Sequence, residues 1–132
     1  MSEKRWWHTM PELAKAIRAE LESGDADAAL RTLLDGINRL PDIATQGHLD
    51  EALTEPDSVG DLRWDTLLAV AIRYRLHQMG ERPPRWTLKD PLDTFWWPVR
   101  VNLSKEYNDM AHSPAELLRV GIFLDERAFT SA

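Results

Sequence analysis

The segment of residues 80–98 constrains the fold most, because its composition excludes both a regular helix and a central strand. It holds four prolines and three tryptophans. Proline lacks a backbone N–H and restricts the residue before it, whereas tryptophan carries a large apolar surface that favours burial. The sequence therefore predicts an ordered, irregular segment held down by its aromatic side chains, which we call the Pro/Trp-rich wrap.

Length, charge and cysteine content narrow the class of protein. A chain of 132 residues is long enough for one core, so we expect a single domain over residues 1–132. Because cysteine is absent, disulfides, thiolate zinc sites and cysteine nucleophiles are excluded. No signal peptide or membrane-length apolar run occurs, which favours a cytoplasmic protein. The net charge of −6 favours a basic protein partner over nucleic acid.

Helical periodicity and capping residues recur along the chain, while strand-like alternation of useful length does not. Thr9 and Glu12 form a capping box, Asp25 and Asp61 are suitable N-caps, and Gly80 is a suitable helix stop. The sequence therefore predicts an all-α, compact single-domain helical bundle. The expected helices are residues 10–23, 26–40, 48–54, 62–79, 100–111 and 114–120, with a last turn ending at residue 129.

The helix expected at residues 62–79 should form the centre of the core. Its apolar residues share one face of a 3.6-residue repeat. The second helix, by contrast, should end at Pro41, since proline cannot continue a helix interior. The predicted core face of the central helix consists of Trp64, Leu67, Leu68, Ala71, Ile72, Leu76 and Met79.

The last third of the chain carries two weaker helix signals. Leu103, Tyr107 and Met110 recur at helical spacing and predict the helix of residues 100–111. Residues 113–116, Ser-Pro-Ala-Glu, match a second capping box with proline at the first helical position. We therefore expect two short helices after the wrap.

Metal and acid–base chemistry find little support in the sequence. The four histidines lie far apart and lack the spacing of a zinc motif. Asp61 and Asp65 could form an acid/base pair, but their place at a helix start explains them through capping and the helix dipole. We expect no metal and no cofactor. A solvated charged face also explains the acidic cluster of His48, Asp50, Glu51 and Glu55 better than a cation site does.

Motifs for covalent catalysis and phosphate binding are absent, so we expect no enzymatic activity. The alternative is an enzyme or small-molecule-binding protein with a pocket between the wrap and the helices of residues 62–79 and 100–111. Ser104, Lys105 and Tyr107 are polar residues close to such a pocket. They lack a base partner that would orient a nucleophile.

Basic residues raise a third possibility, a nucleic-acid-associated accessory protein. Residues 4–7, Lys-Arg-Trp-Trp, mix charge with aromatic rings as stacking sites do. The preferred interpretation is structural, with Trp6 or Trp7 fastening the first helix to the bundle. The net negative charge of the chain and the lack of a recognition helix argue against sequence-specific binding of DNA or RNA. Arginines that could line one side of the central helix and wrap are Arg63, Arg73, Arg75, Arg82 and Arg85.

Four short patterns in this order resemble a C-terminal module of bacterial helix-turn-helix proteins associated with toxin–antitoxin loci. They are Gly60 to Ala69, Arg85-Trp86-Thr87, Phe95-Trp96-Trp97-Pro98 and Gly121 to Glu126. The resemblance covers about residues 10–130 and implies a helical module without an established reaction. The DNA-binding domain normally placed upstream is missing from this sequence, so the resemblance does not carry over a transcription-factor role.

These observations favour a module that acts by binding another bacterial protein, as an antitoxin-like or regulatory partner. A basic toxin would suit the acidic chain, with the acidic surface and the wrap covering its active-site mouth. One hypothesis is that Trp97 packs into the core and Trp96 faces the opposite side as an anchor. The alternative, that both indoles are buried against the bundle, is favoured because a monomer tends to bury large apolar groups. The expected partner-binding residues are Trp96, Phe95, Trp86 and Arg85.

Overall fold

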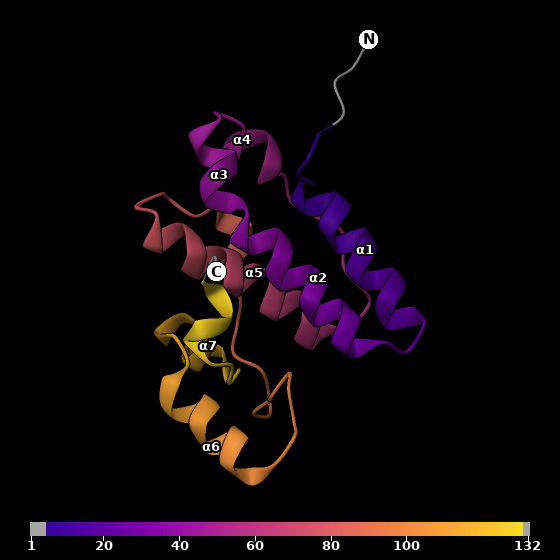
Figure 1. The fold of residues 1–132 in the computed structure, drawn as a ribbon, viewed down its shortest axis with the longest axis vertical. Helices are drawn as coiled ribbons and strands as arrows, with labels where there is room; N and C mark the ends of the chain where they lie inside the picture. Colours follow the sequence, from indigo (N-terminus) through magenta and orange to yellow (C-terminus); the bar gives the residue numbers. More distant parts are fainter. Residues whose placement is uncertain (1–4, 131–132) are drawn as a thin grey trace. The chain divides into compact units, whose positions relative to one another are not determined.

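The computed structural model describes residues 5–130 and shows helices joined by irregular segments (Figure 1). No β-strand occurs within this range, which confirms the predicted all-α class. The α-helices are α1 (Met10–Glu22), α2 (Ala26–Asn38), α3 (Leu40–Thr45), α4 (Leu49–Ala52), α5 (Leu62–Gln78), α6 (Leu103–His112) and α7 (Ala115–Val120). The two 3-10 turns are η1 (Arg85–Thr87) and η2 (Glu126–Phe129).

The chain divides into two compact units, residues 1–59 and residues 60–132, which we call unit 1 and unit 2. Unit 1 contains α1 to α4, and unit 2 contains α5 to α7 with both 3-10 turns. The single-domain expectation for residues 1–132 stays a prediction, which the cooperativity of unfolding would measure.

Local capping explains where the first helices of unit 1 begin. The Thr9 side chain accepts a hydrogen bond from the Glu12 backbone N–H, and the Glu12 carboxylate accepts from the Thr9 N–H, so the predicted capping box is confirmed. Asp25 accepts from the Ala28 N–H at the start of α2, as expected. Trp7, rather than Trp6, is the buried aromatic residue before α1.

The expected end of α2 at Pro41 is wrong. Helix α2 ends at Asn38, and Pro41 lies in the first turn of the separate helix α3. A proline fits there because the first helical residues have no intrahelical partner for an N–H. Proline therefore begins a helix at this position. Helix α4 is also shorter than the expected residues 48–54.

In unit 2, Asp61 caps α5 as predicted, accepting hydrogen bonds from the backbone N–H groups of Arg63 and Trp64. The predicted core face is buried except for Met79, which is half-buried. Burial is wider than predicted, however, because Thr66, Ala69 and Val70 are buried as well. Helix α5 is thus buried around its whole circumference over residues 66–72.

The Pro/Trp-rich wrap is irregular, as expected, apart from η1. Its second half pairs with the segment that follows α7. The Trp96 N–H donates to the Gly121 carbonyl at 2.9 Å, and the Phe123 N–H donates to the Trp96 carbonyl at 2.9 Å. Gly121 adopts a φ of 82°, a left-handed conformation that glycine tolerates best, and ends α7 there.

The capping box expected at residues 113–116 is wrong. Pro114 is the N-cap of α7 and makes no side-chain cap. The Ser113 hydroxyl instead donates to the Asp109 carbonyl and accepts from the Leu124 N–H at 2.8 Å. Ser113 therefore joins the end of α6 to the segment after α7, and that tertiary contact replaces the local cap.

Candidate protein-binding surface

Helix α6 faces the solvent with its apolar side. The exposed fractions of Leu103, Tyr107 and Met110 are 64%, 62% and 40%. Their spacing of four and three residues places them in one stripe, which we call the α6 stripe. The predicted helix is present, but it begins at Leu103 instead of residue 100. Its apolar side faces the solvent and is not a core face. The inward side is polar instead, and comprises Lys105, Glu106, Asn108 and Asp109.

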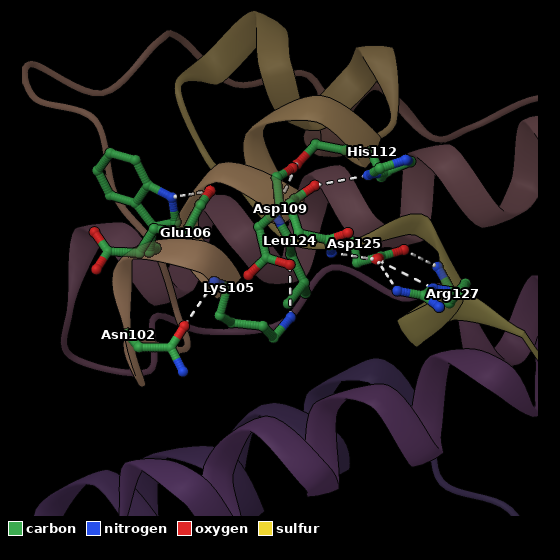
Figure 2. Close-up of polar contacts among 11 residues, drawn as sticks. Asn102, Lys105, Glu106, Asp109, His112, Leu124, Asp125 and Arg127 are labelled. Carbon is green, nitrogen blue, oxygen red and sulfur yellow. Dashed lines mark hydrogen bonds and ion pairs between the residues drawn. The ribbon is translucent and has the colours of Figure 1, made fainter.

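The first inward contact is an ion pair within α6. Asp109 is completely buried, and the Lys105 ammonium donates to its Oδ1 at 2.6 Å. The second carboxylate oxygen, Oδ2, is buried without a hydrogen-bond partner among the described residues. A buried charge loses the stabilisation of water, so the Lys105 contact offsets part of the cost of burying Asp109 (Figure 2).

The second inward contact joins α6 to the turn after α7. The Asn108 amide and the Arg127 guanidinium each donate to Asp125 Oδ2 at 2.7 Å, and the Arg127 N–H donates to Oδ1 at 2.9 Å. The side-chain bonds from Arg127 hold the pKa of Asp125 well below its ordinary value, outweighing the opposite effect of burial. Asp125 is consequently a charged acceptor that binds α6 and begins η2 (Figure 2).

The third contact holds the first half of α6 against the wrap. The Trp97 indole N–H donates to the Glu106 carbonyl at 3.2 Å. Arg100 lies over the Trp97 ring, 4.9 Å from its centroid, and donates to the Glu106 carboxylate at 2.6 Å. Asn102 caps the helix by accepting from the Lys105 N–H at 2.8 Å. The Trp97 contact and the bond between Asn108 and Asp125 together fix which side of α6 faces outward.

The expected partner-binding residues of the wrap have different environments. Phe95 is 69% exposed, and its ring meets Phe123 edge-on at 5.3 Å. Trp86 is half-buried, whereas Arg85 is exposed. The role of these residues in binding stays a prediction, and among them Phe95 offers the most exposed aromatic surface.

The hypothesised difference in burial between the two adjacent indoles is not seen, because Trp96 and Trp97 are both half-buried. The Trp96 ring packs edge-on against Trp64 at 5.5 Å, and the Arg63 guanidinium lies 5.2 Å from the Trp96 centroid. Trp97 packs against Phe123 at 4.8 Å. Each indole thus contacts the fold, which agrees with the alternative in which both serve the packing of the wrap.

Two of the pockets formed by residues 5–130 lie in unit 1. One of about 240 Å³ is lined by Pro11, Ala14, Lys15, Arg18, Asp57 and Ser58. Another of about 330 Å³ is lined by Trp6, Arg39, Asp42, Thr45 and Gln46. Neither contains the polar residues Ser104, Lys105 and Tyr107 that were considered for a pocket beside the wrap.

The residues considered for other chemistry have structural partners. His48 stacks on Trp7 with ring centroids 5.4 Å apart. Asp61 caps α5 and pairs with Arg63 at 3.3 Å. Over residues 5–130, no three histidine or carboxylate side chains come together as a metal site. Arg73 donates to the buried Thr87 hydroxyl at 3.2 Å, so this arginine supports the wrap.

Comparison with protein-family models, curated proteins and solved structures finds no match to this chain. No helix within residues 5–130 is long and apolar enough to cross a membrane.

Sequence reasoning found α6 but missed the surface that it forms. A stripe of apolar residues at helical spacing normally indicates a core face, and nothing local distinguishes it from a binding face. The available signal was on the opposite side. Lys105 and Asp109 are four residues apart on the side away from the stripe, an arrangement compatible with either a solvated or an anchored face.

Proposed function

We propose that this protein is a non-enzymatic protein-binding module, an antitoxin-like or regulatory partner of another protein in the bacterial cytoplasm. The observation that carries the proposal is the α6 stripe. Leu103, Tyr107 and Met110 expose apolar surface on one helix face while the charged side is held inward. Amphipathic helices that dock into protein grooves use anchors at this spacing.

Covering the α6 stripe would stabilise a complex substantially. Complete burial of a large apolar side chain contributes about 1.5–3 kcal/mol relative to full exposure. Leu103 and Tyr107 keep nearly two-thirds of their surface exposed, so a large part of this free energy is still available to a partner. This supports protein binding as the function of the stripe.

The charge distribution supports a basic partner. Residues 1–59 contain 12 acidic and 6 basic residues, whereas residues 60–132 contain 10 of each. The whole negative excess therefore belongs to unit 1. Complementary charge speeds the encounter of two proteins and suppresses wrong partners. A basic toxin is thus a suitable partner for a chain that combines an acidic unit with an apolar docking stripe.

Co-expression with toxin-like reading frames adjacent to the gene tests this function. We expect one product to co-purify in a fixed stoichiometry and its growth arrest to be relieved. Isothermal titration of the two purified proteins should then give a defined Kd. Failure of every neighbouring product to bind, together with saturable binding of a metabolite or of nucleic acid, would refute the proposal.

A further inference from the structure

We infer that α6 docks as a preformed helix into an uncharged, apolar groove of a different protein, with Leu103, Tyr107 and Met110 as its anchors. The inference rests on the proposed protein-binding function and specifies the chemistry of the partner at this site. It also distinguishes the α6 stripe, which favours apolar contacts, from the acidic unit 1, which favours contacts with basic residues.

The three anchors of α6 are uncharged. The other exposed residues of the helix are Ser104 and Ala111, which are small, and His112 at its last position. Lys105 pairs with Asp109 at 2.6 Å on the side opposite the stripe. Glu106 is three residues from Leu103 and four from Met110 and so flanks the stripe, but its carboxylate is paired with Arg100 at 2.6 Å. A phosphate backbone or a charged protein surface would therefore meet charges that are already paired, whereas an apolar groove would match the apolar anchors.

The size of the stripe favours a groove over a second copy of the chain. Helix α6 has 10 residues and is about 15 Å long. Two helices of this length lying face to face bury much less than the roughly 800 Å² per partner that is typical of a stable interface. A groove contacts the helix from its floor and both walls, and so buries more of each anchor. It can also provide a polar rim for the Tyr107 hydroxyl.

The inward contacts fix α6 in the orientation that docking requires. Turning the stripe inward would separate Asn108 from Asp125 and the Trp97 indole from the Glu106 carbonyl. Because the helix is already formed and held, binding requires little additional ordering of its backbone. The anchors are thus presented as a rigid set.

Photo-crosslinking in the source cells tests the site in the full-length protein. A benzophenone amino acid replaces Tyr107 in one variant and Leu62 in a control. Leu62 is a suitable control because it is 71% exposed on α5, in the same unit but outside the stripe. We expect one protein to be crosslinked from position 107 and not from position 62.

The captured protein is then purified and titrated with the wild type, Leu103→Ser, Met110→Ser and the control Leu62→Ser. We expect each anchor variant to weaken binding about tenfold or more, and the control to change Kd less than about twofold. Because the contact is uncharged, the factor lost by each anchor variant should be the same at 50 and 300 mM salt. Unchanged melting temperatures confirm that the variants are folded.

The outcomes separate the inference from the proposed function. A partner that binds the anchor variants with wild-type affinity overturns docking through α6 while leaving protein binding intact. If light scattering shows a homodimer and Leu103→Ser abolishes it, α6 contacts a second copy of this chain, and docking into a groove of a different protein is overturned. Absence of a partner in both the crosslinking and the co-expression experiments refutes the protein-binding function itself.

Discussion

Lys105 and Asp109 form an ion pair whose two ends differ in exposure: the Lys105 Nζ lies 2.6 Å from Oδ1 of a completely buried carboxylate, while the lysine side chain is partly exposed. The pair connects successive turns of α6 and faces inward, opposite the α6 stripe. Because both residues belong to α6, the pair offsets the cost of burying Asp109, while the bonds of Asn108 to Asp125 and of the Trp97 indole to the Glu106 carbonyl turn the stripe outward.

Replacing Asp109 by Ala should destabilise unit 2, because it removes the acceptor for Lys105 and leaves a small void in a buried position. Loss of one partner of a fully buried pair costs about 3–5 kcal/mol, and the partial exposure of Lys105 reduces the expected cost to about 2 kcal/mol. Urea unfolding measures the change. The double variant Lys105→Met with Asp109→Leu should be less destabilised than Asp109→Ala, and the opposite order would contradict the explanation.

Asp125 should make stability depend on acidity. Its pKa is lowered in the folded state, so its contribution is fully present above the unfolded pKa of about 3.9 and is lost as the pH falls toward the folded pKa. The difference in free energy of unfolding between wild type and Asp125→Asn should therefore be largest near pH 7 and decrease below about pH 4. A difference that is constant from pH 7 to pH 3 would exclude this ionic role.

The α5 core offers a direct measurement of packing. Leu68→Ala and Ile72→Ala should each lower the free energy of unfolding by about 2–4 kcal/mol, because both side chains are almost fully buried. Leu62→Ala on the exposed side of the first turn should change it by less than about 0.5 kcal/mol. Chemical denaturation compares the three variants. Equal effects at positions 62 and 68 would show that burial does not determine these costs.

Gly36 should resist replacement in spite of its helical position. A Cβ there would lie 2.6 Å from Cδ2 of the buried Leu13 on α1, closer than these atoms can approach. Gly36→Ala should therefore destabilise unit 1 by about 1–3 kcal/mol, although alanine favours a helix more than glycine does. Thermal melting tests this. Leu13→Ala in the same chain should reduce the cost of Gly36→Ala, and strict additivity would argue against the clash.

Substitutions of the aromatic residues in the wrap should distinguish effects on folding from effects on binding. Trp96→Ala and Trp97→Ala should lower the melting temperature by similar amounts, because both indoles are half-buried against other rings. Phe95→Ala should change it little, since that ring is largely exposed, but should weaken the complex if the wrap contributes to binding. Melting and titration of the same three proteins provide both readouts. A Trp96 variant that melts like the wild type would restore Trp96 as a free anchor.

Capping was the most predictable feature of the fold. Thr9, Asp25 and Asp61 begin their helices as expected, since an N-cap bonds to a backbone N–H only two or three residues away. Such contacts are encoded within one turn of chain. The sequence therefore located the main helices and the irregular wrap correctly, and with them the all-α class.

Local signals were insufficient where a residue had two competing partners. Pro41 can follow one helix or begin another, and Ser113 can cap a helix or bond to a distant segment. In the folded chain Pro41 lies in the first turn of α3, while the Ser113 hydroxyl accepts from the Leu124 N–H, 11 residues away. Sequence spacing does not contain the information that selects between these alternatives.

The sequence by itself determined that α6 is a helix with one apolar and one polar side. Only the tertiary structure decided which side faces outward. There the Asn108 amide donates to Asp125, 17 residues away, and the Trp97 indole of the wrap donates to the Glu106 carbonyl. Periodicity specifies the relative positions of side chains around a helix axis. The rotation of that helix against its surroundings depends on partners that folding alone brings together, and here those partners turn the apolar stripe toward the solvent.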